Sequence, residues 1–276
     1  MAIYINSKRT VLITGCSSGF GKSTAAHFLA RGWNVIATMR SPKSELFDNS
    51  DQLRVTSLDV TKSESISDAI SKGIDRFGKI DALVNNAGIG LFGAHEVTSH
   101  EVIREVFETN TFGVMAVSRA ISPHMRERGS GTIINVTSSA GIAPMPLVAA
   151  YTASKYAIEG FSESLAYELG MFGLQVKILA PSTNFTANSG RRCDNLIPPV
   201  YADYAGRYLK SMQEYPTAYT SAEDVAEAVY AAATDGLDQL RYPAGADSLM
   251  LAELRRSLPE QAFIARVRTM TGGSPP

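Results

Sequence analysis

The sequence predicts a doubly wound α/β fold, in which helices cover both faces of one parallel sheet. Short runs rich in Val and Ile alternate with longer segments whose apolar residues recur three and four positions apart. This is the pattern of strands joined by crossover helices. The strand runs are continuously apolar, so both faces of the sheet should be buried. The chain of 276 residues shows no internal repeat or Pro/Gly/Ser-rich linker, and we expect residues 1–276 to form one domain.

The individual elements follow from local sequence. We expect strands over residues 10–14, 34–38, 53–58, 82–84, 132–136 and 175–179, with a weaker pattern over 239–242. Expected helices cover residues 23–30, 63–77, 101–127 and 151–172. Another helix begins at Ser221, where Ser-Ala-Glu-Asp is typical of a capping box. Residues 182–218 lack a strong period, which is typical of an active-site lid or, alternatively, of a surface excursion; residues 271–276 should fray.

Composition limits the classes of partner. The chain carries 26 Lys+Arg against 27 Asp+Glu, a net charge of -1, which argues against nucleic acid or an anionic membrane as the main partner. Two cysteines, Cys16 and Cys193, can form neither a disulfide framework nor a structural zinc site, so no metal is expected. We find no targeting segment and no apolar stretch near the ~20 residues of a membrane span. These observations predict a cytoplasmic protein that binds a small molecule.

A glycine-rich segment marks the expected phosphate-binding turn. It runs from Thr14 to Gly21 (Thr-Gly-Cys-Ser-Ser-Gly-Phe-Gly), directly after the first strand and into the first helix. Small residues there let backbone N–H groups approach a pyrophosphate at the helix N-terminus. A plain tight turn is the alternative, and Cys16 fits as a small residue better than as a reactive thiol. The expected cofactor contacts are Gly15, Ser17, Ser18, Gly19, Phe20 and Gly21.

The ends of the second and third strands bear on the choice of cofactor. The second strand closes with Ala-Thr-Met-Arg40, which lacks the carboxylate that would bind a free ribose 2′-hydroxyl. Arg40 would instead hold a 2′-phosphate, unless it is simply a solvated residue at a strand end. Asp59 and Val60, at the end of the third strand, are expected to meet the adenine ring. Asp59 is equally suited to cap the following helix.

The candidate catalytic residues lie around the fifth strand. Tyr151 and Lys155 are four apart on an expected helix and therefore share a face. A nearby ammonium favours phenolate and would lower the pKa of the tyrosine. Ser138 closes the fifth strand, whose carboxyl end is where ligands bind in such sheets, so its hydroxyl should lie beside the phenol.

Two amide motifs are ambiguous on sequence alone. Asn110 falls within the apolar stripe of its helix, where a buried amide needs partners. It either satisfies backbone groups or holds a water in a proton relay. The segment Asn85-Asn-Ala-Gly88 is either an ordinary turn or a wall of small residues against the cofactor, with Asn85, Ala87 and Gly88 as contacts.

Taken together, these motifs resemble the short-chain dehydrogenase/reductase family in order and spacing, over residues 8–250. The resemblance implies a three-layer Rossmann-type sheet of seven strands and an NAD(P)(H)-dependent oxidoreductase. It implies that Tyr151 is the general acid for carbonyl reduction and the base for alcohol oxidation. Ser138 would bind the substrate oxygen, and Lys155 the nicotinamide ribose while lowering the pKa of Tyr151. Asn110 would support a water-linked relay.

The resemblance is nearest the branch of 17β-hydroxysteroid and retinol dehydrogenases, through the segments 86–93 and 154–165. Met145, with Leu147 and Val148, would suit the wall of an apolar substrate pocket or be ordinary core. One departure follows the sixth strand, where the family has Pro-Gly and this chain has Pro181-Ser182. If that position needs φ > 0, Ser182 would alter the loop beside the nicotinamide. The expected cofactor contacts there are Pro181, Thr183 and Thr186.

The sequence therefore predicts an NADP(H)-dependent enzyme that interconverts a ketone or aldehyde with the corresponding alcohol. An NAD-preferring enzyme of the same family is one alternative. A non-catalytic NADP(H) sensor is another, although a sensor has no need of the paired phenol and ammonium. The resemblance further implies a homodimer or homotetramer formed through the helices 101–127 and 151–172.

Overall fold

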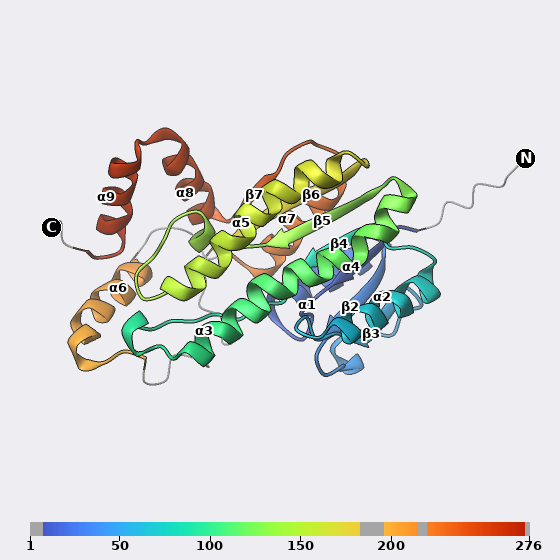
Figure 1. The fold of residues 1–276 in the computed structure, drawn as a ribbon, viewed down its shortest axis with the longest axis horizontal. Helices are drawn as coiled ribbons and strands as arrows, with labels where there is room; N and C mark the ends of the chain where they lie inside the picture. The colour runs from blue at the N-terminus through green and yellow to red at the C-terminus, as the bar shows by residue number, and fades with distance from the viewer. Residues whose placement is uncertain (1–7, 183–195, 215–219, 274–276) are drawn as a thin grey trace, which may run out of the picture.

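A single parallel sheet organises the protein. The structure is a computed structural model that describes residues 8–182, 196–214 and 220–273. In these ranges seven parallel strands follow the order β3-β2-β1-β4-β5-β6-β7 (Figure 1), so the doubly wound Rossmann-type sheet is confirmed. The strands are β1 (Thr10–Ile13), β2 (Asn34–Met39), β3 (Leu53–Ser57), β4 (Ala82–Asn85), β5 (Gly131–Val136), β6 (Leu174–Pro181) and β7 (Arg241–Ala244).

Helices cover both faces of this sheet. On one face lie α1 (Gly19–Ala30) and α7 (Ala222–Thr234), and on the other α2 (Ser63–Phe77), α4 (Gly113–Arg128) and α5 (Ala149–Gly170). Alternate residues of a strand pack against the helices on opposite faces of the sheet. In β1, Val11 and Ile13 pack with Phe28 of α1, whereas Leu12 packs with Ile66 of α2. Continuous apolar runs are therefore required, because every position of a central strand is buried.

The helix expected over residues 101–127 is interrupted. It consists of α3 (His100–Phe107), a π-helical turn η3 (Glu108–Phe112) and α4. Asn110 lies in the π turn and is fully buried. Such turns insert one residue into a helix and often re-aim a side chain at a functional site, and the apolar period alone does not reveal the insertion.

The last part of the chain adds helices at one end of the molecule. The segment 182–218 contains a helix, α6 (Ala202–Glu214), after the short helix η6 (Pro199–Tyr201), although no helix is expected there from the sequence. After β7 come α8 (Ala246–Ser257) and α9 (Glu260–Met270), and α6, α8 and α9 gather at the same end (Figure 1). The other short helices within the described residues are η1 (Ser44–Leu46), η2 (His95–Val97) and η4 (Ser139–Gly141).

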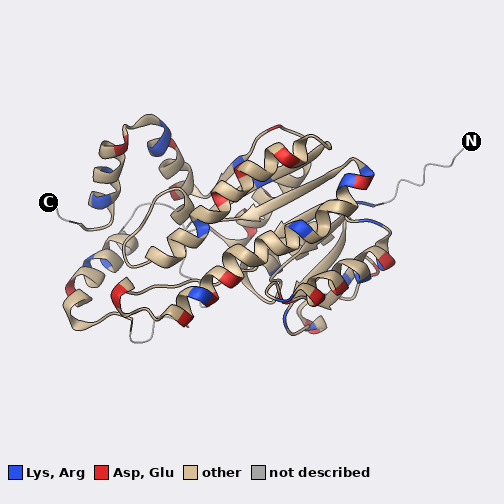
Figure 2. Cartoon of the chain, viewed as in Figure 1, with Lys and Arg blue, Asp and Glu red and all other residues tan. Residues whose placement is uncertain are grey.

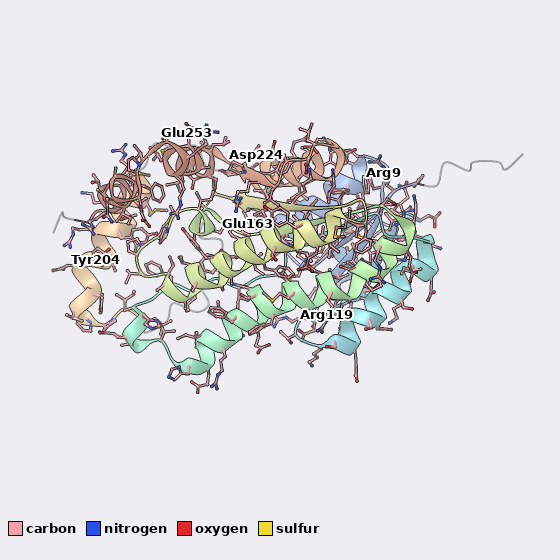
Figure 3. The ribbon with its side chains drawn as sticks, turned by 45° about the horizontal axis from the view of Figure 1, so that its top comes forward. Arg9, Arg119, Glu163, Tyr204, Asp224 and Glu253 are labelled. Carbon is pink, nitrogen blue, oxygen red and sulfur yellow. The ribbon has the colours of Figure 1, made fainter. Side chains whose placement is uncertain are left out.

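The capping box expected at Ser221 is present at the start of α7. The Asp224 backbone N–H donates to Ser221 Oγ at 3.0 Å, and the Ser221 N–H donates to Asp224 Oδ2 at 2.9 Å. Figure 3 labels Asp224 at this helix. The two bonds satisfy N–H groups that have no partner within the helix.

Charged side chains are interspersed over the surface. In the view of Figure 2, basic and acidic residues alternate along the outer helices, as the balanced charge count implies. In the described ranges, no helix combines the length and apolar character needed to cross a membrane.

Candidate active site

A cavity of about 830 Å³ opens at the carboxyl ends of the strands. It lies beside the switch point between β1 and β4, from which the strand order proceeds in opposite directions. This is where ligands bind in open α/β sheets. The predicted site residues that line it are Gly15, Ser17, Ser18, Gly19, Phe20, Arg40, Asp59, Val60, Ala87, Gly88, Ser138, Met145, Tyr151, Lys155 and Pro181.

The turn after β1 depends on glycine at two positions. Gly15 has φ +76, and a Cβ there would lie 2.9 Å from the Ala87 Cα. Gly21 is buried in α1 and does not line the cavity; a Cβ there would lie 2.3 Å from the Gly15 carbonyl oxygen. Gly21 therefore lets α1 pack against the turn, whereas Gly15 shapes the wall that a pyrophosphate would meet.

Thr14 and Asn86 join the ends of β1 and β4. Thr14 Oγ1 accepts the backbone N–H groups of Asn86 at 3.0 Å and Ala87 at 2.9 Å. The Asn86 side chain donates back to the carbonyl oxygens of Thr14 and Gly15. Asn86 lines the cavity, whereas the expected contact Asn85 does not.

The prediction for Asn85 therefore needs correction. Its amide is buried beneath the sheet and donates to Ser118 Oγ at 2.9 Å and to Asn135 Oδ1 at 2.8 Å. In a strand, successive side chains point to opposite faces, so the first amide of the pair turns into the core. Asn85 links β4 to β5 and α4.

Cys16 is a structural residue of the turn. Its Sγ donates to the Ile13 carbonyl oxygen at 3.3 Å. Burial raises the pKa of the thiol to about 12, although the backbone of Thr38 opposes the rise. The thiol is therefore unreactive at neutral pH.

Arg40 and Asp59 lie at one edge of the cavity. Arg40 is exposed and follows β2, and its positive charge acts on Asp59. Asp59 Oδ1 accepts from the Thr61 N–H at 3.0 Å and from the Thr61 hydroxyl at 2.7 Å. Burial acts to raise the pKa of Asp59, but the Thr61 hydrogen bonds, with the charges of Lys62 and Arg40, hold it below its usual value. The carboxylate thus closes a turn and also faces the cavity.

Ser138, Tyr151 and Lys155 come together as expected. Ser138 Oγ accepts the Ala140 N–H at 3.1 Å and is hydrogen-bonded to the Tyr151 phenol. Lys155 Nζ lies 5.8 Å from the centre of the Tyr151 ring and donates to the Val136 carbonyl oxygen at 3.0 Å. Ser138, which follows β5, and Tyr151 and Lys155 of α5 all line the same cavity.

The expected lowering of the Tyr151 pKa is not found. Burial of the hydroxyl raises the pKa of Tyr151, and the hydrogen bond with Ser138 only opposes this rise. Burial likewise lowers the pKa of Lys155 to about 8, although the charge of Glu159 works against the fall. The expectation rested on the nearby charge alone, whereas desolvation dominates in this buried site.

Asn110 is held by backbone groups. Its Oδ1 accepts the Ile89 N–H at 2.8 Å, and its Nδ2 donates to the Ile89 carbonyl oxygen at 2.9 Å and to Ser154 Oγ at 3.2 Å. Asn110 does not line the cavity. These bonds favour the first of the two sequence interpretations, in which the amide satisfies the backbone of the loop after β4.

Ser182 adopts ordinary backbone geometry. Leu147 is the non-glycine residue with positive φ in the described ranges, so φ > 0 is not needed at Ser182. The Ser182 N–H donates to the Ala244 carbonyl oxygen at 2.8 Å, and its Oγ donates to the same oxygen at 3.1 Å. The serine thereby adds a bond between β6 and β7. The expected contacts Thr183 and Thr186 lie outside the described residues.

Tyr208 of α6 is a cavity residue that the sequence analysis misses. It is fully buried, its ring stacks on Phe92 at 6.1 Å between centres, and its hydroxyl donates to Met145 Sδ at 3.6 Å. Met145 and Tyr208 both line the cavity and pack in one apolar cluster with Phe92 and Tyr151. The spacing of Ala205, Tyr208 and Met212 is typical of one face of a helix, although the segment 182–218 as a whole lacks a strong period.

Comparison with known proteins identifies the family. The family model described as short chain dehydrogenase matches residues 9–195. The chain belongs to the short-chain dehydrogenase family. It is 36% identical over 266 residues to an uncharacterized oxidoreductase of Bacillus subtilis, YusZ, covering 91% of this chain and 94% of that protein.

Two further relatives have named activities. 3-Ketodihydrosphingosine reductase of Bacteroides thetaiotaomicron is 37% identical, with 74% of each chain covered. Human retinol dehydrogenase 8 is 36% identical, with 75% of this chain and 65% of that protein covered. The resemblance to a branch that includes retinol dehydrogenases therefore agrees with the comparisons.

Solved structures share the fold over most of the chain. A short-chain dehydrogenase from Streptomyces avermitilis superposes with a TM-score of 0.77 at 32% identity, covering 94% of this chain and 98% of that one. One from Burkholderia cenocepacia in complex with NADP gives 0.74 at 26% identity, covering 95% and 98%. A 3-ketoacyl-(acyl-carrier-protein) reductase from Brucella melitensis with NADH gives 0.70 at 25% identity, covering 85% and 96%.

Proposed function

We propose that the protein is an NADP(H)-dependent enzyme that interconverts a ketone or aldehyde with its alcohol, with Tyr151 as general acid/base. The observation that carries the proposal is one cavity lined by both the glycine turn after β1 and the group of Ser138, Tyr151 and Lys155. A cofactor sensor would use the turn alone. The buried Ser138 hydroxyl and Lys155 ammonium, with the half-buried Tyr151 phenol between them in the same cavity, provide for proton transfer.

The cavity fits a dinucleotide. Gly15 keeps its wall open where a Cβ would collide with Ala87, and helix α1 begins at Gly19 beside the turn, which favours an anion there. Arg40 at the edge of the same cavity would meet a ribose 2′-phosphate with a fork of donors. When bound, NADPH supplies the hydride for carbonyl reduction.

Side chains of the cavity would transfer the proton and bind the substrate oxygen. Ser138 and Tyr151, already hydrogen-bonded to each other, would both donate to the oxygen of a carbonyl substrate. Tyr151 would release its phenolic proton to that oxygen as the alcohol forms, and the raised pKa of the phenol keeps this proton in place until then. Lys155 in its charged form would stabilise the resulting phenolate.

The substrate is proposed to be largely apolar. An apolar cluster contains Phe92, Val148, Tyr208, Tyr151 and Met145. All of these except Phe92 line the cavity. A named reductase of a sphingoid ketone and a retinol dehydrogenase are among the relatives, which supports this class without deciding between them.

The test is an NADPH-consumption screen of purified protein. The panel contains long-chain ketones, retinoid aldehydes, steroid ketones and short β-keto esters, each assayed with NADPH and with NADH. The proposal expects turnover of at least one apolar carbonyl with NADPH and loss of that turnover in Tyr151→Phe. If the variant matches the parent on every substrate, the proposed role of Tyr151 is wrong.

We also propose that the protein self-associates through the outer surface of α4 and α5. Tyr167 and Met171 at the end of α5 are more than 80% exposed, and Phe172 and Phe112 are also exposed. Exposed apolar side chains that cluster are typical of interfaces, and Tyr167, Met171 and Phe172 lie within six residues of one another. Sedimentation velocity of the parent and of a Tyr167→Glu/Met171→Glu variant would measure the effect, and a monomeric parent would contradict the proposal.

A further inference from the structure

A buried carboxylate lies one helical turn beyond Lys155. Tyr151, Lys155 and Glu159 are spaced four apart on α5 and so lie along one face of the helix. Glu159 does not line the cavity, yet it is buried. Burying a carboxylate is unfavourable unless it is paired and hydrogen-bonded, so its contacts need an explanation.

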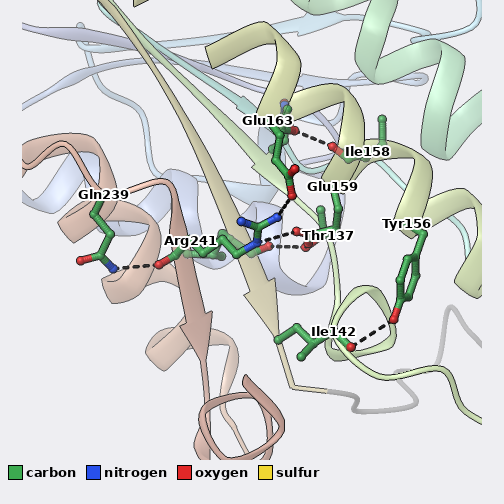
Figure 4. Close-up of polar contacts among 11 residues, drawn as sticks. Thr137, Ile142, Tyr156, Ile158, Glu159, Glu163, Gln239 and Arg241 are labelled. Atoms are coloured by element: carbon green, nitrogen blue, oxygen red, sulfur yellow. Dashed lines mark hydrogen bonds and ion pairs between the residues drawn. The ribbon is translucent and has the colours of Figure 1, made fainter. Parts of the chain in front are cut away.

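Glu159 holds the segment that carries Ser138. Its Oε1 accepts from Thr137 Oγ1 at 2.7 Å, and Thr137 directly precedes Ser138 (Figure 4). A Cβ at Gly141 would lie 3.2 Å from Oε1, so the carboxylate lies beside the turn η4, where glycine leaves room for it. The contact therefore spans both ends of the short segment that places the Ser138 hydroxyl.

Arg241 of β7 fixes the other oxygen of Glu159. Its Nε donates to Glu159 Oε2 at 3.2 Å, and its Nη2 pairs with Glu163. Figure 4 shows the guanidinium between the two glutamates. Glu163, also labelled on α5 in Figure 3, is half-exposed, whereas the Glu159 side chain is 10% exposed. The same arginine thus binds one buried and one solvated carboxylate.

The charge of Glu159 also acts on Lys155. Lys155 Nζ donates to the Val136 carbonyl oxygen of β5 and faces the Tyr151 ring on its own helix, and the charge of Glu159 opposes the loss of its proton. Thr137 and Arg241 hydrogen-bond to Glu159, the charge of Glu163 acts on it, and the charge of Glu159 in turn acts on Tyr156. Burial raises the pKa of Glu159, but Thr137 and Arg241 counteract this rise and favour the carboxylate.

We propose that Glu159 is a positioning residue that keeps Lys155 in its cationic form and fixes the turn that carries Ser138, with Arg241 holding the carboxylate in place. The inference rests on the proposed function. A neutral Lys155 has no charge with which to stabilise a phenolate at Tyr151. Glu159 of α5 and Arg241 of β7, which both lie outside the cavity, therefore determine how far catalysis persists at alkaline pH.

The matched variants are Glu159→Gln and Glu163→Gln, since each removes one carboxylate from Arg241 and only the first removes a charge near Lys155. Lys155 is titrated by NMR with ¹³Cε-labelled lysine in the free protein, and its resonance is assigned with Lys155→Met. Glu159→Gln is expected to lower the titration midpoint by about one pH unit, within the range found for a close opposite charge. Glu163→Gln should leave the midpoint unchanged.

The same variants are then compared as carbonyl reductases. At saturating NADPH, the alkaline limb of the kcat/KM profile should move to lower pH in Glu159→Gln and stay in place in Glu163→Gln. If Glu159→Gln does not fold, Arg241→Gln replaces it, because loss of the guanidinium favours the protonated form of Glu159 and should shift the midpoint in the same direction.

The outcomes separate the inference from the proposed function. A midpoint that is unchanged in the folded variant, or shifted equally by Glu163→Gln, overturns the role of Glu159. Failure of the parent to reduce any carbonyl contradicts the proposed function, and the NMR midpoint in the free protein still decides whether Glu159 controls the charge of Lys155.

Discussion

Replacing Arg40 by Ala should remove the proposed preference for NADPH. Arg40 and Lys155 are the basic side chains that line the cavity within the described ranges, and Arg40 alone of the two lies at the end of β2. Hydrogen bonds to a charged group contribute about 1.5–3 kcal/mol. Because Arg40 is exposed, the lower end applies, and about 1.5 kcal/mol corresponds to roughly a tenfold change in affinity.

The assay is the Kd of NADPH and of NADH by fluorescence titration, supported by kcat/KM with each cofactor. Arg40→Ala should weaken NADPH about tenfold and leave NADH unchanged. Lys43→Ala is the matched control, since Lys43 is exposed and close in sequence but does not line the cavity. An equal loss for both cofactors, or no change in discrimination, would refute the role of Arg40.

Three further predictions concern the turn, the apolar wall and the buried ammonium. Gly15→Ala should abolish measurable cofactor binding while the far-UV circular dichroism is retained, because the added Cβ would meet the Ala87 Cα at 2.9 Å and φ +76 is unfavourable for alanine. Tyr208→Leu should raise the KM for bulky apolar ketones relative to small ones, whereas Tyr208→Phe, which keeps the ring stacked on Phe92, should change it little. For Lys155, whose pKa falls from 10.5 to about 8 on folding, the unfolded state binds more protons between these values, so this group adds stability as pH rises. In urea unfolding, the stability of the parent relative to Lys155→Met should therefore increase by about 2 kcal/mol from pH 7.5 to 9.5, and a constant difference would contradict the buried charge.

Patterns that depend on burial and turn geometry could be predicted well. The strands and α2 follow from continuous apolar runs and from a helical period, and the capping box fixes the start of α7 at Ser221. The cavity residues of the turn after β1, with Ser138, Tyr151 and Lys155, follow from their position at the carboxyl ends of parallel strands. In such a sheet, topology alone brings these loops together.

Features set by tertiary packing could not be predicted. Asn85 and Asn86 are adjacent amides, and only the strand register shows that the first turns into the core. The π turn at Asn110 depends on its bonds to Ile89, which is 21 residues away. The pKa of Tyr151 depends on how completely its hydroxyl is buried, and no sequence spacing reports that quantity.

The proposed function depends most directly on proton transfer from the Tyr151 phenol within the cavity that is proposed to bind NADPH. The decisive measurement is NADPH binding and single-turnover carbonyl reduction by the parent and by Tyr151→Phe. We predict that Tyr151→Phe binds NADPH as tightly as the parent and loses at least about a hundredfold in the rate of reduction, as expected on removal of a general acid. An unchanged rate in the variant would contradict the proposed function.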